Sequence, residues 1–376
     1  MPDPDAELRP GPPPGFEPDP SRPAGRTRVA MVLTASTGGI GRHVASVAPR
    51  LAARGFDVTV YASPVTLAAH DVGVPAVPLD AVALARGVAA ADVVHAHGYK
   101  AAALALPYAR VRRVPLVVTW HNAVLDSGGG ARAGRILQRV VARGADVVLA
   151  ASSDLLAQAV ALGAREARLA PVAAPALALP VLARDARRAT LGLAPDDVLV
   201  VTVTRLAPQK NLDLLLDVAA RTRDRADLAY ALVGSGPLHD ALARRVVDEG
   251  LRVTLVGASD DVASWFRASD LALLPSRWEA RALVAQEAML AGVPLVATRV
   301  GGIPELVGEA AVLVDPDDAG AAADAVRRLA DDATARRALA DAGLRQAATW
   351  PGEDDVADEL GLVYRHVLTG RGRSAS

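Results

Sequence analysis

Apolar runs alternate with amphipathic segments of helical length along most of this chain. The runs at 29–35, 58–62 and 271–274 consist mainly of Val, Leu and Ala, and each is followed by Ser or Pro. Between such runs, apolar residues recur at helical spacing, for example at Val44 and Val47. Short apolar runs with these boundaries predict buried strands. Strands that alternate with helices predict parallel, doubly wound sheets whose ligands gather at the carboxyl ends of the strands.

One interruption of this alternation divides the chain into two halves. Between about 169 and 185 the sequence is rich in Pro and Ala and has no clear period, and a second alternation begins at 198–204. We therefore expect two Rossmann-like domains, over 28–182 and 183–350, followed by a helix over 351–370. The Pro-rich residues 1–27 and the small, polar residues 371–376 are expected to be disordered.

Length and composition limit the class of protein. The chain has 376 residues, 51% of them hydrophobic, which suffices for two cores. A formal net charge of −1 disfavours a nucleic-acid-binding protein, and the lack of cysteine excludes disulfides and thiolate zinc sites. Neither a signal peptide nor an apolar run long enough to cross a bilayer is recognisable. These features predict a cytoplasmic protein, with the inner face of the membrane as an alternative location.

Two carboxylates stand out in the stretch 271–307. Glu279 lies in a predicted loop and Glu287 on the predicted helix at 282–291, followed by a strand at 294–297 and by Gly301 and Gly302. At 1.5 Å per helical residue, the two carboxylates are separated by up to about 12 Å. This spacing spans a sugar plus a ribose and is too wide for a directly coupled acid–base pair. For either glutamate alone, an exposed surface position is the simpler interpretation.

Two cations follow the predicted strand at 198–204. Arg205 and Lys210 lie at the turn that opens the next helix, where a fork-shaped and a point-like cation suit a diphosphate. Two solvated surface cations are the alternative. Gly38 and Gly39 lie at the first strand-to-helix turn, but Val44 stands where a dinucleotide fingerprint needs a third glycine.

Histidines follow several predicted strands of the first half. His95 and His97 lie in DVVHAHG, His121 lies in VVTWHN, and His43 opens the first helix in GRHV. A single histidine of this kind is more often a hydrogen-bonded structural residue than a catalytic one. The position of His121 at a strand end favours a functional role.

These motifs together resemble one known family. The pair Glu279-x7-Glu287, followed by AMLAGVPLVATRVGGIPELV, resembles the donor-binding signature of family 4 glycosyltransferases with the GT-B fold. The Arg205-x4-Lys210 pair and the histidine motifs resemble further motifs of this family in the same order, so the resemblance covers about 29–368. It implies an α/β protein with two Rossmann-like domains facing a cleft, and a last helix that crosses back onto the N-terminal domain.

The resemblance also implies roles for individual residues. Glu279 would face the donor sugar, and Glu287 would bind the ribose hydroxyls of the nucleotide. Arg205 and Lys210 would neutralise the donor diphosphate, and His121 would lie near the donor sugar. His97 and His43 would be acceptor-side or structural residues.

Smaller residues are implied to line the donor site. Gly38 and Gly39 would lie near the phosphate and the acceptor, Gly234 belongs to a Gly-x-Gly-Pro turn, and the base would rest near Val256 and Gly257. The family usually has Gly or Pro directly after the first glutamate and Gly three positions after it. Here these positions are Ala280 and Ala282, which leaves the geometry of this loop open.

The predicted activity is that of a retaining, metal-independent hexosyltransferase. It would move a sugar from a nucleotide-diphosphate sugar to a hydroxyl acceptor, without a cofactor and without a metal site. Asp315 and Asp317 are a weaker candidate for Mg²⁺. The acceptor would be a small molecule, such as an inositol phosphate, or a lipid-linked hydroxyl, with contact to a membrane surface in the second case. Arg42, His43, Tyr99 and Lys100 are candidates for contacts to a lipid-linked acceptor.

Two alternatives share the donor site. A sugar-nucleotide epimerase of GT-B-like fold would convert the donor without an acceptor. A catalytically weak nucleotide-sugar-binding protein would bind the donor without turnover, and Ala280 and Ala282 are the residues that point this way.

Overall fold

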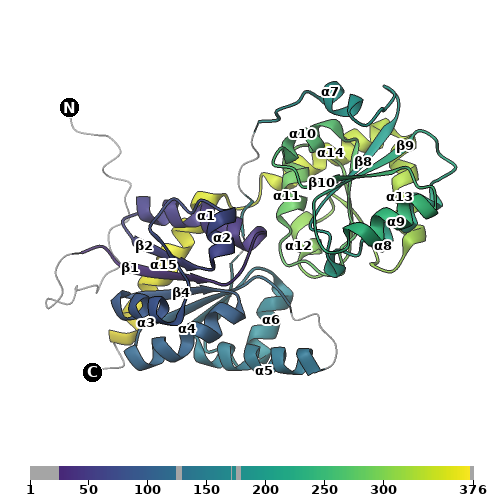
Figure 1. The fold of residues 1–376 in the computed structure, drawn as a ribbon. Coiled ribbons are helices and arrows are strands. Elements are labelled where there is room, and N and C mark those ends of the chain that lie inside the picture. The colour runs from purple at the N-terminus through teal and green to yellow at the C-terminus, as the bar shows by residue number, and fades with distance from the viewer. Residues whose placement is uncertain (1–24, 124–128, 171, 175–178, 373–376) are drawn as a thin grey trace, which may run out of the picture.

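The computed structural model describes residues 25–123, 129–170, 172–174 and 179–372, which form two parallel sheets enclosed by helices (Figure 1). The first sheet has seven strands in the order β3-β2-β1-β4-β5-β6-β7. Its strands are β1 (Arg28–Leu33), β2 (Asp57–Ala62), β3 (Ala76–Pro78), β4 (Val93–His97), β5 (Leu116–Trp120), β6 (Val147–Ala150) and β7 (Ala167–Leu169). The predicted doubly wound architecture is confirmed, because every pair in this sheet is parallel.

Side chains of β1 alternate between two cores. Ala30 and Val32 pack toward one face, and Val29, Met31 and Leu33 pack toward the other. The first face is covered by α3 (Ala81–Ala90), α4 (Tyr99–Arg112), α5 (Gly129–Gly144) and α6 (Ser153–Ala161), and the opposite face by α1 (Gly39–Ala53) and α15 (Glu353–Gly372). The short α2 (Pro64–Ala69) follows β2.

The second sheet has six parallel strands in the order β10-β9-β8-β11-β12-β13. They are β8 (Val198–Val203), β9 (Leu228–Val233), β10 (Val253–Gly257), β11 (Leu271–Leu274), β12 (Leu295–Thr298) and β13 (Val312–Val314). One face carries α8 (Leu212–Arg221), α9 (His239–Asp248) and α13 (Ala319–Asp331). The other face carries α10 (Val262–Ala268), α11 (Leu283–Leu290), α12 (Ile303–Val307) and α14 (Ala333–Ala347), and α7 (Arg184–Ala189) packs on α10.

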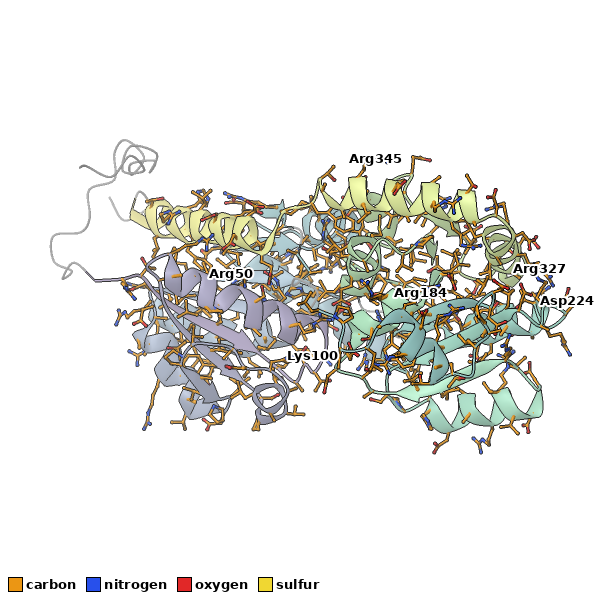
Figure 2. All side chains as sticks on the ribbon, turned by 90° about the horizontal axis from the view of Figure 1, so that it is seen from above. Arg50, Lys100, Arg184, Asp224, Arg327 and Arg345 are labelled. Carbon is orange, nitrogen blue, oxygen red and sulfur yellow. The ribbon has the colours of Figure 1, made fainter. Side chains whose placement is uncertain are left out.

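The last helix, α15, packs on the first domain rather than on the second. Tyr364 of α15 is completely buried in the core beneath α1. Arg50 of α1 pairs with Glu353 at 2.9 Å, and Arg54 pairs with Asp358 at 2.6 Å. Seen from above, α15 lies alongside α1 and Arg50 (Figure 2).

Several predicted boundaries are wrong. Apolar residues of helical period over 319–343 predict a single helix from the sequence. The structure has α13 and α14 instead, because Asp332 accepts hydrogen bonds from the backbone of Thr334 and Ala335 and starts a new helix. The edge strands β3 and β7 were not predicted, since each has only three residues. Residues 371 and 372 are helical rather than disordered, while the disorder predicted for 1–24 and 373–376 lies outside the described residues.

No helix in the part of the chain that the structure describes is long and apolar enough to cross a membrane.

Candidate active site at the contact between the domains

Loops that follow the carboxyl ends of strands in both sheets meet where the domains touch. Arg42, after β1, forms an ion pair with Glu287 on α11 of the second domain. Trp278, after β11, donates from Nε1 to Asp154 Oδ2, after β6, at 2.8 Å. Gly39 faces Leu283 closely enough that an added Cβ would lie 3.4 Å from its Cδ1. The predicted site residues of the two domains therefore belong to one region.

Glu279 and Lys210 form the polar centre of this region on the second domain. Lys210 Nζ lies 2.6 Å from Glu279 Oε1, and the Ser276 hydroxyl donates to the same oxygen at 2.7 Å. Glu279 is only 8% exposed, so its charge needs these partners. The sequence predicted a diphosphate-binding Lys210 and a sugar-facing Glu279, and here each neutralises the other. Ser276 was missed.

Strand adjacency and side-chain hydrogen bonds to the backbone fix Lys210 beside Glu279. Strands β8 and β11 are neighbours in the sheet, so the loops that follow them start side by side. Gln209 donates from Nε2 to Trp278 O at 2.9 Å. Asn211 adopts a left-handed conformation, φ +50°, and donates to Pro316 O at 2.9 Å. Asn tolerates this conformation better than most residues, which lets the chain turn sharply after Lys210.

Glu287 is the more deeply buried carboxylate. Its residue is 2% exposed, and burial raises the pKa of its carboxyl, while the Arg42 guanidinium acts in the opposite direction. Arg42 itself is 41% exposed at its side chain. The position predicted to bind ribose hydroxyls is thus occupied by a cation from the other domain.

Arg205 differs from Lys210 in its surroundings. Its side chain is exposed, and no ion pair or hydrogen bond joins it to the residues that the structure describes. It follows β8 directly, in the loop that leads to Lys210. The two predicted diphosphate cations therefore lie in one loop. The Arg205 side chain has no partner among the described residues, and Lys210 is paired with Glu279.

Glycine permits a close approach of the loops after β8 and β9. An added Cβ at Gly234, φ +142°, would lie 1.8 Å from Thr204 O. Gly234 also donates to Gly257 O at the end of β10, at 2.7 Å. Gly234, Val256 and Gly257, predicted to surround the base, thus lie together at the strand ends beside Arg205.

Gly302 performs a similar task beneath Glu279. Its amide donates to Glu279 O at 2.9 Å, and an added Cβ would lie 1.9 Å from Ala280 O. Ala280 and Ala282 are themselves buried and are absent from the left-handed residues of the described chain, which besides glycines are Arg113 and Asn211. The loop thus holds Glu279 without glycine at these two positions.

Four buried histidines gather on the first domain. His95 bonds to Tyr364 Oη and to Thr119 Oγ1, each at 2.7 Å, which makes it a structural residue that links β4 to α15. His97 Nδ1 lies 3.2 Å from His121 Nε2, and the ring of His43 lies across both. Burial lowers the pKa of His43 to about 4 and that of His95 to about 3, and it lowers the pKa values of His97 and His121 well below the usual range. The cluster is therefore neutral near pH 7.

His43, His97 and His121 have the spacing of metal ligands. One ring nitrogen of each lies within 4.8 Å of the other two, and this is the one such group among the described histidines and acidic residues. His97 Nε2 is buried without a hydrogen-bond partner. Neutral imidazoles suit a transition metal. Asp317, from the weaker Mg²⁺ candidate, is exposed and lies 3.6 Å from Arg277 instead.

Gly38 and Gly39 lie at the start of α1, on the side of the first domain that faces α11. Tyr99 and Lys100 open α4, directly after β4. Lys100 is exposed at the end of the first domain that faces the second (Figure 2). Lys100 and Lys210 are the only lysines of the sequence, a signal that would have set both apart from the many arginines.

Further contacts between the domains were not predicted. Ser153 donates its amide to Glu305 at 3.0 Å. Gln286 accepts from Ala174 N at 3.0 Å and donates to Val172 O at 3.2 Å. Gln286 and Glu287 are consecutive on α11, so the same helix binds the end of the first domain and presents its carboxylate to Arg42.

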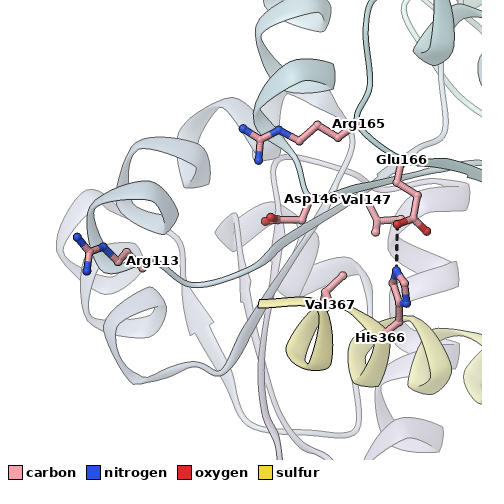
Figure 3. Close-up of a pocket in the computed structure, with 8 residues that line it drawn as sticks. Arg113, Asp146, Val147, Arg165, Glu166, His366 and Val367 are labelled. Atoms are coloured by element: carbon pink, nitrogen blue, oxygen red, sulfur yellow. Dashed lines mark hydrogen bonds and ion pairs between the residues drawn. The ribbon is translucent and has the colours of Figure 1, made fainter. Parts of the chain in front are cut away.

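A separate cavity lies away from this region. A cavity of about 620 Å³ opens between the start of β6 and the end of α15, where His366 bonds to Glu166 at 3.0 Å (Figure 3). Asp146 and Glu166 precede β6 and β7, so this cavity lies at the amino ends of the strands. It faces away from the histidines and carries none of the predicted site residues.

Comparison with known proteins agrees with this arrangement. Residues 38–175 match a glycosyl transferase 4-like domain, and residues 197–332 match glycosyl transferases group 1. The D-inositol 3-phosphate glycosyltransferase 1 of Catenulispora acidiphila is 35% identical over 311 residues, which cover 75% of this chain and 74% of that protein. The D-inositol 3-phosphate glycosyltransferase of Thermomonospora curvata is 30% identical over 397 residues, with 88% and 91% covered.

Solved structures share the fold. HepE from Anabaena, in complex with UDP, superposes with a TM-score of 0.77 at 19% identity, over 90% of this chain and all of that one. The sucrose-phosphate synthase of Thermosynechococcus elongatus gives a TM-score of 0.75 at 23% identity, over 92% of this chain and 100% of that one. The two sheets are thus the two domains of a GT-B fold, and the chain belongs to the family 4-type glycosyltransferases.

Proposed function

We propose that this glycosyltransferase moves a hexose-type sugar from a nucleoside-diphosphate sugar to a hydroxyl acceptor, with retained anomeric configuration and without a bound metal. The observation that supports this most directly is the meeting of Lys210, Glu279 and Glu287 with Arg42 and Gly39 at the contact between the domains. Residues proposed to bind the donor thus lie beside residues of the first domain, where the acceptor would bind.

The donor diphosphate would be held by Arg205 and Lys210. Arg205 is free, and Lys210 is paired with one carboxylate, so a diphosphate carrying more than one negative charge competes well for both cations. Glu279, released from Lys210, would then accept hydrogen bonds from sugar hydroxyls. Glu287 would exchange the Arg42 guanidinium for the ribose hydroxyls.

Retention follows from a reaction on one face of the sugar. The bond between the anomeric carbon and the diphosphate oxygen breaks, the acceptor oxygen bonds to the same face, and the acceptor proton passes to the leaving diphosphate. Two cations at the diphosphate stabilise the charge that grows there, which is the task a metal ion performs in other enzymes. Neutral His121 would accept or donate a hydrogen bond to the sugar rather than act as a charged acid.

The acceptor is proposed to carry a phosphate. Relatives at 35% and 30% identity are named D-inositol 3-phosphate glycosyltransferases. When ribose displaces Arg42 from Glu287, the guanidinium becomes available to an anionic group on the first domain, where exposed Lys100 also lies. An inositol phosphate in solution is the first acceptor to test, and a lipid-linked polyol phosphate is the second.

Calorimetric binding of UDP, GDP and ADP, and of their glucose, N-acetylglucosamine and mannose conjugates, tests the donor site. One nucleotide is expected to bind equally with and without EDTA, to lose most of its affinity in Lys210→Ala, and to keep it in Lys100→Ala. A requirement for divalent metal would contradict the proposal and would direct attention to His43, His97 and His121.

Turnover with the preferred donor then separates the alternatives. Transfer to an inositol phosphate, abolished in Glu279→Ala while nucleotide binding remains, supports the proposed reaction. Conversion of the donor sugar without an acceptor would indicate an epimerase. Binding without turnover with any acceptor would indicate a nucleotide-sugar-binding protein.

A further inference from the structure

The outer surface of α4 and α5 is positively charged, whereas the chain as a whole is nearly neutral. Neither helix contains Asp or Glu. Exposed arginines lie at 110 and 112 on α4 and at 132, 135, 139 and 143 on α5. The formal net charge of the whole chain is −1, so the positive charge of this surface is balanced elsewhere.

The arginines of α5 repeat along one stripe. Arg132, Arg135, Arg139 and Arg143 are three or four residues apart, which places them on one side of the helix. Arg132, Arg135 and Arg139 form no ion pair with any carboxylate that the structure describes. Ion pairs are common elsewhere, for example where Arg54 of α1 meets Asp358 of α15. The stripe is therefore charged and uncompensated.

Apolar side chains lie within the same stripe. Ile136 is 58% exposed and Val140 is 50% exposed, each beside an arginine of α5. Leu104 and Val111 of the neighbouring α4 are also exposed, Val111 to 81%. Exposed apolar side chains between arginines do not improve the solubility of a protein and lower it slightly, so they indicate a contact surface. The opposite side of α5 is buried through Val141 and Ala142, so the helix is already anchored to its own domain.

We propose that this surface, the exposed side of α4 and α5, docks the enzyme on an anionic lipid surface. Arginines attract the negatively charged headgroups, and Ile136 and Val140 enter the boundary between headgroups and acyl chains. Nucleic acid would be attracted by the arginines but would gain nothing from the apolar pair. This inference goes beyond the proposed transfer reaction and does not depend on the identity of the donor or the acceptor.

The docking surface lies on a different side of the first sheet from the histidines. α3 to α6 cover one face, whereas α1 and α15 cover the other, and Figure 1 shows α1 and α4 on opposite sides of the strands. The acidic start of α15, with Glu353, Asp354 and Asp355, belongs to the second layer. Arg50 and Arg54 of α1 pair with these acidic residues, whereas the arginines of α5 belong to a layer whose helices α4 and α5 contain no acidic residue.

Sedimentation with lipid vesicles tests the proposal on the full chain. Wild-type protein is expected to bind vesicles of phosphatidylcholine with 30% phosphatidylglycerol and not to bind pure phosphatidylcholine, with weaker binding at high salt. The double variant Arg135→Glu/Arg139→Glu should lose at least about tenfold in binding, since each basic residue near such a surface contributes about fivefold. Ile136→Ser/Val140→Ser should weaken binding without removing its dependence on charge.

The matched control is Arg337→Glu/Arg345→Glu, which changes the charge equally on exposed positions of α14 in the second domain. It should bind vesicles as the wild type does. Equal loss in both double variants, absence of vesicle binding, or binding to duplex DNA in place of vesicles would overturn the proposal. Circular dichroism and donor binding should be unchanged in the α5 variants, so a failed transfer reaction remains distinguishable from failed docking.

Discussion

The guanidinium of Arg42 on α1 is paired across the domain contact with the carboxylate of Glu287 on α11. Glu287 is almost completely buried, whereas the Arg42 side chain is 41% exposed. A buried carboxylate that loses its only cationic partner becomes easier to protonate. The Arg42 guanidinium therefore opposes the protonation that burial of Glu287 favours, and the pair joins the two domains at the same time.

Replacement of Arg42 should make nucleotide binding depend on pH. In Arg42→Ala, burial alone acts on Glu287 and raises the pKa of its carboxyl further. The protonated carboxyl accepts ribose hydroxyls poorly, so affinity for the preferred nucleotide should fall as the pH is lowered from 8 to 6. Wild-type affinity should be nearly constant over this range. Calorimetry at both values measures the effect, and Arg50→Ala, on the same helix, is the control. Parallel behaviour of Arg42→Ala and wild type would contradict the assigned role of Glu287.

The two lysines should react differently with an amine-reactive reagent. Lys100 is exposed, whereas Lys210 is held by Glu279 at 2.6 Å. Acetylation followed by mass spectrometry should show Lys100 reacting at least about fivefold faster, a factor that roughly 1 kcal/mol of charge-assisted bonding supplies. The preferred nucleotide should change the rate at Lys210 and leave Lys100 unaffected. If the nucleotide changes neither rate, Lys210 does not contact the diphosphate.

The buried histidines should make the first domain less stable in mild acid. An unfolded histidine binds a proton below about pH 6.5, whereas folded His43 does so only near a pKa of about 4. The free energy of unfolding therefore has its full value above about pH 6.5. At lower pH it decreases by about 1.4 kcal/mol per pH unit for each such histidine.

Thermal melts between pH 7 and pH 5 measure this dependence. In His43→Gln the slope should be smaller by about the share of one histidine, while His239→Gln, at an exposed position of the second domain, should behave as wild type. If the melting temperature of His43→Gln depends on pH as that of the wild type does, groups other than His43 cause the loss of stability in acid.

A methyl group at Gly302 should disturb the loop that carries Glu279. An added Cβ would lie 1.9 Å from Ala280 O and 2.7 Å from Ser152 Cβ, so both the loop and the domain contact must shift. Overpacking of this kind costs about 1–3 kcal/mol, and nucleotide-sugar affinity should fall with the melting temperature. Gly370→Ala is the matched control, because its added Cβ meets no atom within 4 Å and Ala favours the helix. A Gly302→Ala protein with wild-type stability and affinity would show that this contact is not required.

The sequence predicts better which residues lie close together within one sheet than which residues of the two sheets contact each other. Lys210 and Glu279 follow β8 and β11, which are adjacent parallel strands, and the apolar runs that form these strands are clear. The family resemblance placed them at one site for the same reason. Arg42 and Glu287 belong to different sheets, and no periodicity specifies how two separately folded sheets are oriented.

Local competition explains the remaining differences. The apolar period continues across Asp331 and Asp332, so the sequence favours one helix, but the Asp332 carboxylate satisfies two backbone donors of the next helix and ends the first. His95 carries the same motif as His97, yet its bonds to Thr119 and Tyr364 make it a structural residue. Tyr364 lies 269 positions away in the chain, beyond the reach of any local pattern.

The return of α15 to the first domain has a consequence for synthesis on the ribosome. The second domain is inserted between β7 and α15, so the first domain begins the chain and is completed only when α15 has emerged. At translation rates of about 5–20 residues per second, α1 waits roughly 16–64 seconds for α15. During this interval Phe56, which packs on the ring of Tyr364, and His95, which bonds to its hydroxyl, lack these partners. A nonsense codon after α14 would therefore damage the domain that was made first.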